Sequence, residues 1–148
     1  MSITLPQEYI YPLAGVLSTF YVLFFQVVRV GGARKAAGIK YPQLYAEKAE
    51  AQSNREARLF NCVQRAHQNT LENLPTALFS TLVAGLVYPR FAGCACAFWS
   101  VARIIYTIGY GSGDPAARNL LGANVMGSLT QYTLLLTATW SLVKLAIA

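Results

Sequence analysis

Apolar residues gather in four long runs along the chain. The runs 9–28, 91–108 and 120–143 each have about the length that crosses a hydrocarbon layer of ~30 Å. The run 74–87 is too short alone, so its helix must extend backwards through the polar stretch before it. The pattern predicts one all-α integral membrane domain, residues 1–148, built as a four-helix bundle. The four transmembrane helices are expected at about 9–30, 55–87, 91–110 and 116–146.

Proline and glycine residues set the boundaries of these helices. The second helix is expected to end before Tyr88, and Pro89 predicts a tight turn on the lumenal side at 88–90, because proline stops a helix. The cluster Gly111–Pro115 predicts a loop. The fourth helix is expected to begin at Pro115 or Ala116, with proline in its first turn. Pro75 lies inside the second helix, where it either kinks the helix or frees carbonyls that find other partners.

The composition agrees with lipid as the solvent. Charged residues are 12% of the 148 and hydrophobic residues 55%, against roughly 25% and 45–50% in soluble domains. The longest polar segment, 29–58, carries seven of the 12 Lys and Arg residues. By the positive-inside rule this segment is cytosolic, and the N-terminus lies across the membrane, in the lumen if the membrane is the endoplasmic reticulum. Because topology explains the basic charge, nucleic-acid binding is not expected.

The ends and the cysteines add little chemistry. The residues before the first apolar run include Glu8 but no basic residue, and no clean cleavage site follows the run. We therefore expect a retained anchor rather than a signal peptide. Cys62 stands alone, and Cys94 and Cys96 lie about 200° apart on a helix. They offer neither a disulfide framework nor metal-ligand spacing, and no metal is expected.

Four polar side chains share one face of the second predicted helix. At about 100° per residue, these side chains fall within an arc of roughly 80°; they are Asn61, Arg65, Asn69 and Glu72. Such a face can grip a small zwitterion, with Arg65 and Glu72 each binding the opposite charge of the ligand. Alternatively, an intramembrane pair of Arg65 and Glu72 fixes helix packing. His67 points about 200° away from Arg65, towards a neighbouring subunit or the headgroups.

A second polar group lies on the third and fourth helices. Arg103, Tyr106 and Tyr110 fall within an arc of roughly 60° and can line a polar crevice, although tyrosines are also typical of the interfacial belt. A cation inside a span needs a cavity or a partner, so Arg103 either neutralises Glu72 or contacts a ligand. Arg118 is expected in the first turn of the fourth helix, where a cation opposes the helix dipole. That placement indicates an anionic partner or a lipid phosphate.

Three polar motifs carry a resemblance to a known family. The run NCVQRAHQNTLENLP at 61–75 is followed by RIIYTIGY at 103–110 and GDPAAR at 113–118. Together they resemble the MAPEG family, the membrane-associated proteins of eicosanoid and glutathione metabolism. The motif at 61–75 is long and specific, and it is closest to the type 3 microsomal glutathione S-transferase branch. The resemblance covers the chain from the first helix to the fourth.

The resemblance implies a homotrimer of four-helix protomers that binds glutathione between neighbours near the cytosolic face. His67 and Asn73 stand where leukotriene-C synthase has glutamine and tyrosine. Arg118 resembles the arginine that activates the thiol, after one extra residue in the preceding loop, and is the implied catalytic residue. The implied glutathione-binding residues are Arg34, Arg65, His67, Asn69, Glu72, Asn73, Tyr106 and Tyr110.

The resemblance further implies a glutathione transferase with glutathione peroxidase activity in the endoplasmic reticulum membrane, its site facing the cytosol. A guanidinium near the glutathione sulfur favours the thiolate and lowers the pKa of the thiol. Lipid hydroperoxides or lipophilic electrophiles then reach the sulfur from the bilayer. The family also contains non-catalytic lipid-presenting scaffolds, which is the alternative function. A third possibility is a small transporter or channel subunit that uses Arg65, Glu72 and Arg103 as an ion path.

Overall fold

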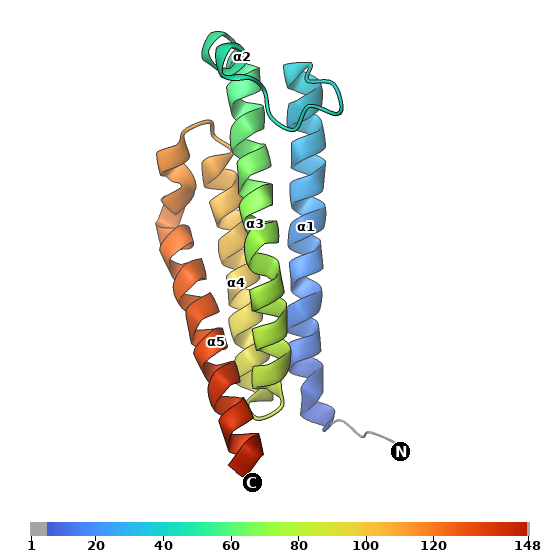
Figure 1. The fold of residues 1–148 in the computed structure, drawn as a ribbon, viewed down its shortest axis with the longest axis vertical. Helices are drawn as coiled ribbons and strands as arrows, with labels where there is room; N and C mark the ends of the chain where they lie inside the picture. The colour runs from blue at the N-terminus through green and yellow to red at the C-terminus, as the bar shows by residue number, and fades with distance from the viewer. Residues whose placement is uncertain (1–5, 148) are drawn as a thin grey trace.

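The structure is a computed structural model that describes residues 6–147 (Figure 1). Every regular element among these residues is helical. Four long α-helices form the body, and one short α-helix and two 3-10 helices lie between or before them. In chain order the elements are η1 Gln7–Tyr9, α1 Ile10–Ala37, α2 Lys48–Ser53, α3 Arg55–Gly85, α4 Pro89–Tyr110, η2 Pro115–Gly122 and α5 Ala123–Ile147.

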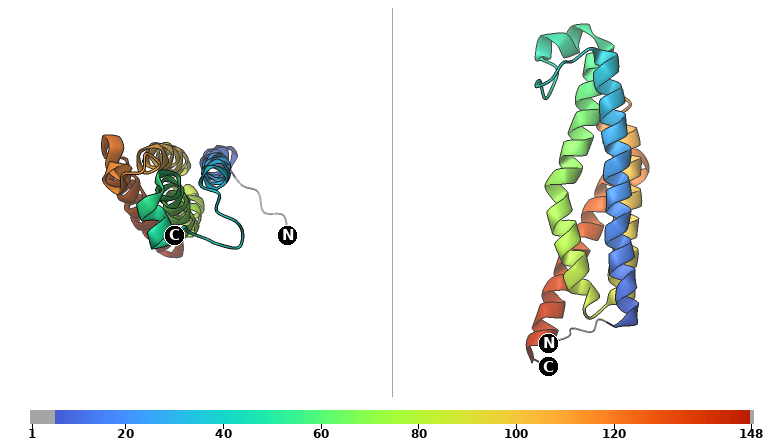
Figure 2. Two further views of the ribbon diagram at one scale, coloured as in Figure 1. Left: turned by 90° about the horizontal axis from the view of Figure 1, so that it is seen from above. Right: turned by 90° about the vertical axis from the view of Figure 1, so that its right-hand side faces the viewer.

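The long helices run side by side with alternating direction (Figures 1 and 2). α3 and α4 occupy the middle of the bundle, because α1 packs against both of them and α5 packs against the same two helices from the other side. α1 ends, α3 begins and α4 ends at one end of the bundle, where α2 also lies (Figure 1). We call this the loop end.

Glycine allows α1 and α4 to approach closely. A Cβ atom at Gly15 would lie 2.8 Å from the carbonyl oxygen of Gly93, and a Cβ at Gly93 would overlap the Tyr11 backbone. Small residues at helix interfaces permit such contact between backbones, as is common in membrane helices. Ser18 of α1 and Ser100 of α4 are hydrogen-bonded at 2.7 Å along the same interface.

Three of the long helices lie close to where the sequence predicts them. α1 continues to Ala37, beyond the expected residue 30, and ends where Gly38 adopts a left-handed φ of 69°. α3 begins at Arg55 and remains one helix through Pro75. α4 begins at Pro89, with proline in its first turn, and ends at Tyr110 as expected.

The fourth helix differs from the prediction at its start. α5 begins at Ala123, not at Pro115 or Ala116, and residues 115–122 form the separate 3-10 helix η2. Backbone geometry breaks the helix between them: Leu121 has a φ of 50° and Gly122 a φ of 72°, both outside the right-handed helical region. The interpretation that Arg118 opposes the dipole of the fourth helix is therefore wrong.

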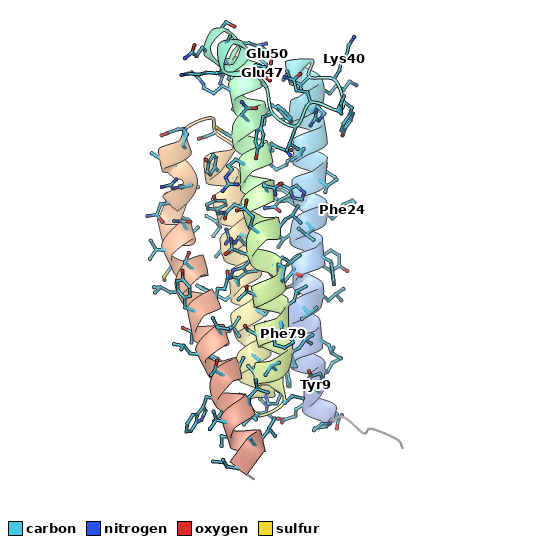
Figure 3. All side chains as sticks on the ribbon, in the orientation of Figure 1. Tyr9, Phe24, Lys40, Glu47, Glu50 and Phe79 are labelled. Carbon is cyan, nitrogen blue, oxygen red and sulfur yellow. The ribbon has the colours of Figure 1, made fainter. Side chains whose placement is uncertain are left out.

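Two of the long helices are long and apolar enough to cross a membrane by length and composition: the continuous segment Gln7–Ala37 and α4. Large apolar side chains also point outwards along α1 and α5, as Phe24 does on α1 (Figure 3). They include Leu17, Phe20 and Phe24 on α1 and Leu129, Leu136 and Trp140 on α5. Apolar surface of this extent is typical of a lipid or subunit interface rather than of a water-exposed monomer.

α5 carries several threonines that lower its apolar character. Each of their hydroxyl groups donates a hydrogen bond to the carbonyl four residues earlier in the same helix, so no donor faces lipid unsatisfied. These threonines are Thr130, Thr133, Thr137 and Thr139. α5 is thus compatible with an apolar environment although its composition alone does not identify a span.

Candidate polar face between α3 and α4

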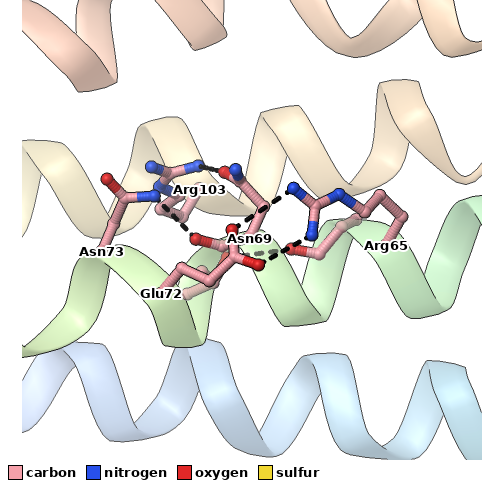
Figure 4. Close-up of polar contacts among 7 residues, drawn as sticks. Arg65, Asn69, Glu72, Asn73 and Arg103 are labelled. Atoms are coloured by element: carbon pink, nitrogen blue, oxygen red, sulfur yellow. Dashed lines mark hydrogen bonds and ion pairs between the residues drawn. The ribbon is translucent and has the colours of Figure 1, made fainter.

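Arg65 and Glu72 form the exposed part of the predicted polar face. They lie seven residues apart on α3, and two hydrogen bonds of 2.8 and 3.3 Å join the guanidinium to the carboxylate (Figure 4). The two side chains remain 43% and 44% exposed, so a ligand can reach both charges. An ion pair this exposed contributes only about 0–1 kcal/mol. A ligand with opposite charges can therefore exchange partners with it at little cost.

Arg103 lies behind this pair and is buried. Its Nη1 donates a 2.8 Å hydrogen bond to Oδ1 of Asn69, which joins α4 to α3 (Figure 4). The guanidinium carbon lies 5.1 Å from the ring centre of Trp99 and 5.2 Å from that of Tyr106. Within residues 6–147, the ion pairs do not include one between Arg103 and Glu72. Of the two predicted roles, direct neutralisation of Glu72 is therefore wrong in this chain.

The two tyrosines of the α4 stripe lie next to each other. Their ring centres are 5.6 Å apart, with the planes tilted by 57°. Tyr106 is buried with Ala66 of α3 and Ala123 of α5, and Tyr110 packs against this cluster. Because Tyr106 also contacts Arg103, the predicted stripe of one guanidinium and two phenols is present, facing α3.

Arg118 comes to this region on η2. The Asp114 carboxylate caps η2 by accepting a 2.9 Å hydrogen bond from the Ala116 amide. The carbonyl of Ala117 lies so close to Gly109 that a Cβ atom there would overlap it, and this contact holds η2 against the end of α4. Arg118 itself is exposed.

The arginines of the site come to it on different elements. Arg103 lies against the ring of Tyr106, Arg65 lies on α3, and Arg118 lies on η2, which packs on the end of α4. These arginines come from α4, η2 and α3, so three separate segments supply positive charge to one region. One carboxylate, Glu72, stands among them, so the face suits a ligand with more negative than positive charge.

The model of the MAPEG family matches residues 12–140. The chain belongs to the MAPEG family. It is therefore a membrane protein of a family that uses glutathione, generally forms trimers, and includes both glutathione-dependent enzymes and non-catalytic members. The matched region contains all three polar motifs of the sequence and every residue of the face described above.

Arg34 lies apart from the other candidate residues of this MAPEG chain. Its Nη1 donates a 2.7 Å hydrogen bond to the carbonyl of Gln43, and its guanidinium lies between the rings of Tyr41 and Phe60 at 4.4 and 4.6 Å. These contacts join the end of α1 to the following loop and to α3. Within one chain, Arg34 does not share the face that carries Arg65.

His67 faces α1 of its own chain. Its Nδ1 lies 3.2 Å from Oε1 of Gln26, so the expectation of a neighbouring subunit or the headgroups is wrong for this nitrogen. The amide NH2 of Gln26 donates to the hydroxyls of Thr70 and Thr107, both at 2.8 Å. Each hydroxyl donates in turn to its own helix, which fixes the amide orientation. Since the amide oxygen only accepts, His67 carries its proton on Nδ1 and leaves Nε2 as an acceptor.

Two amides of the second-helix motif are occupied within the chain. Asn61 exchanges hydrogen bonds of 2.7 and 2.9 Å with the backbone of Ala46, which anchors the loop before α2. Asn73 donates a 2.8 Å hydrogen bond to the Asn69 carbonyl and lies beside Arg103 in the close-up (Figure 4).

Sequence reasoning missed Gln26 and Gln131, which are both buried. Gln131 of α5 accepts a 3.3 Å hydrogen bond from the Trp99 indole and donates one of 3.4 Å to the Asn73 carbonyl. The available signal was an amide inside an apolar run, because a polar group in a span needs a partner. Together the two glutamines connect α1 and α5 to the two helices that carry the candidate face.

Proposed function

We propose that this MAPEG protein is a glutathione transferase with peroxidase activity on lipophilic electrophiles and lipid hydroperoxides. The observation that carries the proposal is the accessible Arg65–Glu72 pair on α3, which lies beside Arg103 and Tyr106 of α4, with the Arg118 segment packed on the end of α4. Glutathione has two carboxylates and one ammonium group, and this face offers three guanidinium groups and one carboxylate. The motif at 61–75 resembles that of the type 3 microsomal branch, and this resemblance supports the same activity.

The exposed ion pair is the proposed grip on glutathione. Arg65 binds a carboxylate of the tripeptide, Glu72 binds its ammonium group, and the internal ion pair is exchanged for two ligand contacts. Asn69 and Asn73 lie beside the pair as further polar contacts, and Tyr106 and Tyr110 line the side formed by α4.

Arg118 is the proposed catalytic residue. A guanidinium stays protonated at neutral pH, so it does not remove the thiol proton; it favours the thiolate by charge and hydrogen bonding. In conjugation, the thiolate attacks an electrophilic carbon and a C–S bond forms as the leaving group departs. In peroxide reduction, it attacks one peroxide oxygen and the O–O bond breaks. The products are a lipid alcohol and a sulfenic acid, which a second glutathione converts to the disulfide and water.

Trimer formation would complete the site. Arg34 and His67 do not share the Arg65 face within one chain, but a site between protomers can take them from a neighbour. Arg34, His67 and Arg65 lie towards the loop end, which carries the basic segment. The positive-inside rule assigns that end to the cytosol. The proposed location is the endoplasmic reticulum membrane, with glutathione entering from the cytosol and lipid substrates from the bilayer.

One observation favours a lipid-presenting scaffold instead. Arg65 and Glu72 already bind each other on α3. In a non-catalytic scaffold, this pair would only stabilise that helix. Thermal stability in detergent, measured with and without glutathione, distinguishes an ion channel from the other two functions. A channel has no reason to be stabilised by the tripeptide.

The deciding experiment is replacement of Arg118 by alanine. We expect turnover at saturating glutathione to fall by about 10²–10³-fold, as when one preorganised electrostatic group is removed, with glutathione affinity largely retained. Peroxidase and conjugation rates are measured with a panel of lipid hydroperoxides and electrophiles. Arg58→Ala, another exposed arginine near the loop end, is the matched control and should stay active. Unchanged turnover in the Arg118 variant would refute its catalytic role.

A further inference from the structure

Asn69 connects the buried cation of the bundle to the exposed ion pair. Its side chain lies between Arg103 of α4 and the Arg65–Glu72 pair of its own helix (Figure 4). Nη1 of Arg103 donates a 2.8 Å hydrogen bond to Oδ1 of Asn69. The orientation of this one amide therefore decides which polar group α3 presents beside the pair.

Arg103 depends on the oxygen of this amide. The arginine is 5% exposed, and its Nε is buried without a hydrogen-bond partner. Within residues 6–147 its guanidinium forms no ion pair, and it lies against the rings of Trp99 and Tyr106. A guanidinium only donates hydrogen bonds. Turning the amide over would bring an NH2 group against this buried cation and remove its acceptor.

The amide of Asn69 consequently has one favoured orientation. Its oxygen faces Arg103, and its NH2 group is left as a donor. Within residues 6–147, Nδ2 of this half-buried residue has no hydrogen-bond partner, and unlike the Nε of Arg103 it keeps contact with solvent. A charged donor on the oxygen also polarises the amide, which makes its NH2 group a stronger donor. The buried cation thus acts on the polar face through one amide.

From this arrangement, we infer that Arg103 is a positioning residue for glutathione: it holds the Asn69 amide so that Nδ2 donates to the carboxylate bound by Arg65. The inference rests on the proposed function, and in it Arg103 does not touch the ligand itself. Asn69 lies one helical turn from Arg65, so one carboxylate can meet both donors. The fixed amide favours a ligand oxygen at this position and disfavours an ammonium group.

Asn69→Asp is the first test. The aspartate keeps an accepting oxygen for Arg103 and gives it a counter-ion, but it replaces the NH2 donor with a second, negatively charged oxygen. Isothermal titration calorimetry on the purified full-length protein in detergent measures the affinity for glutathione, which should fall by roughly tenfold to hundredfold. The melting temperature without glutathione should stay at or above that of the wild type.

Gln68→Glu is the matched control for this variant. It makes the same change from amide to carboxylate at the neighbouring residue of α3, which points about 100° away from Asn69. Its affinity for glutathione should stay close to that of the wild type.

Variants of Arg103 test the positioning role itself. Arg103→Met removes the donor that fixes the amide, so the affinity for glutathione should fall several-fold, and Arg103→Lys should recover most of that loss because it keeps a charged donor. In an Asn69→Ala background, Arg103→Met should have no further effect on the affinity. The melting temperature of each variant reports whether it is folded. If Arg103→Met does not fold, Asn69→Asp still decides the inference, because it leaves Arg103 in place.

Several results would overturn the inference. Wild-type affinity in Asn69→Asp would show that the amide only joins two helices, and a higher affinity would show that it accepts from the ammonium group. An equal loss in Gln68→Glu would show a general effect of negative charge. A further loss from Arg103→Met in the Asn69→Ala background would show that the guanidinium contacts glutathione directly. These results leave the proposed function standing, whereas a wild-type protein that does not bind glutathione would overturn both.

Discussion

At the scale of single residues, the main question is whether Arg65 and Glu72 serve packing or a ligand. Both side chains are more than two-fifths exposed, and a pair in that position adds little to stability. The buried charged residue is instead Arg103, which is 5% exposed and is fixed by Asn69 and two aromatic rings. The buried cation therefore holds α3 and α4 together, and the exposed pair is free to exchange partners.

Glu72→Gln tests whether the exposed pair binds a ligand or only supports packing. The variant loses the charge that would bind the ammonium group of glutathione, a contact worth about 2 kcal/mol, so we expect glutathione affinity to fall roughly thirtyfold. Isothermal titration calorimetry measures the affinity, and turnover at saturating glutathione should change much less.

The matched control for this prediction is Glu56→Gln. It makes the same change on the same helix, at a residue outside the candidate face. A Glu72 variant with wild-type glutathione affinity and a lowered melting temperature would support the packing role instead. The melting temperature is informative because only a structural ion pair would move it without moving the affinity.

The sequence predicted the residues of the face well and their partners less well. Helical periodicity alone places Arg65, Asn69 and Glu72 on one side of α3. It places Asn61 there too, but it cannot predict that this amide binds Ala46, because that partner depends on the path of a loop. Likewise, it located Arg103 on the right stripe of α4 but not its hydrogen bond to Asn69, which depends on the register between two helices.

At the scale of elements, Gln26 sets that register. Its amide is fully buried in α1 and binds Thr70 of α3 and Thr107 of α4. Thr70 directly follows Asn69, and Thr107 directly follows Tyr106. One side chain of α1 therefore links the two helices next to the residues proposed to meet glutathione, and it acts as a positioning residue.

Replacing Gln26 by leucine should weaken both the bundle and the site. Three hydrogen bonds of about 0.6 kcal/mol each are lost, so we expect a lower melting temperature. A register change between α3 and α4 should also raise the KM for glutathione several-fold, with a smaller effect on kcat.

Thr19→Val on the same helix is the control for that variant. Thr19 is equally buried, but its hydroxyl donates only to the Val16 carbonyl of its own helix. A positioning role requires the KM to change in the Gln26 variant and not in the Thr19 variant. Equal changes in both, or a lower melting temperature with an unaltered KM, would limit Gln26 to structural support.

The elements that the sequence predicted best are those defined by long apolar runs and by proline. α3 and α4 begin with residues that propensity predicts, because the Asn54 side chain caps α3 and Pro89 is the first residue of α4. The break before α5 was missed because it depends on the left-handed conformation of Leu121, a residue with no preference for it. The break separates the Arg118 segment from α5, and η2 packs on Gly109 at the end of α4, where the proposed function needs Arg118.

At the scale of the whole molecule, the candidate residues divide between separate faces of one chain. Arg65, Glu72 and Arg118 lie towards α3, α4 and η2, whereas Arg34 lies where α1 meets the loop after it. A cyclic trimer uses two different surfaces of each protomer at every interface. It can therefore bring the Arg34 region of one chain to the Arg118 region of the next.

Mixed trimers test this arrangement. Arg34→Ala and Arg118→Ala each remove one half of every site in a homotrimer, so both variants should have low activity. When the two are co-expressed in equal amounts, a site is complete if an Arg34 variant supplies Arg118 and its neighbour supplies Arg34. Random assembly into trimers then restores roughly one quarter of the sites. Co-purification with two affinity tags followed by peroxidase assay measures the recovery.

Recovery has only one structural explanation here. If all residues of a site came from one protomer, every site in a mixed trimer would still lack Arg34 or Arg118, and activity would stay at the level of the single variants. Because Arg34 also binds the Gln43 carbonyl, each homotrimer must first show a wild-type oligomeric mass and a cooperative melting transition. With that satisfied, absence of recovery would assign Arg34 to the stability of its own chain and remove it from the glutathione site.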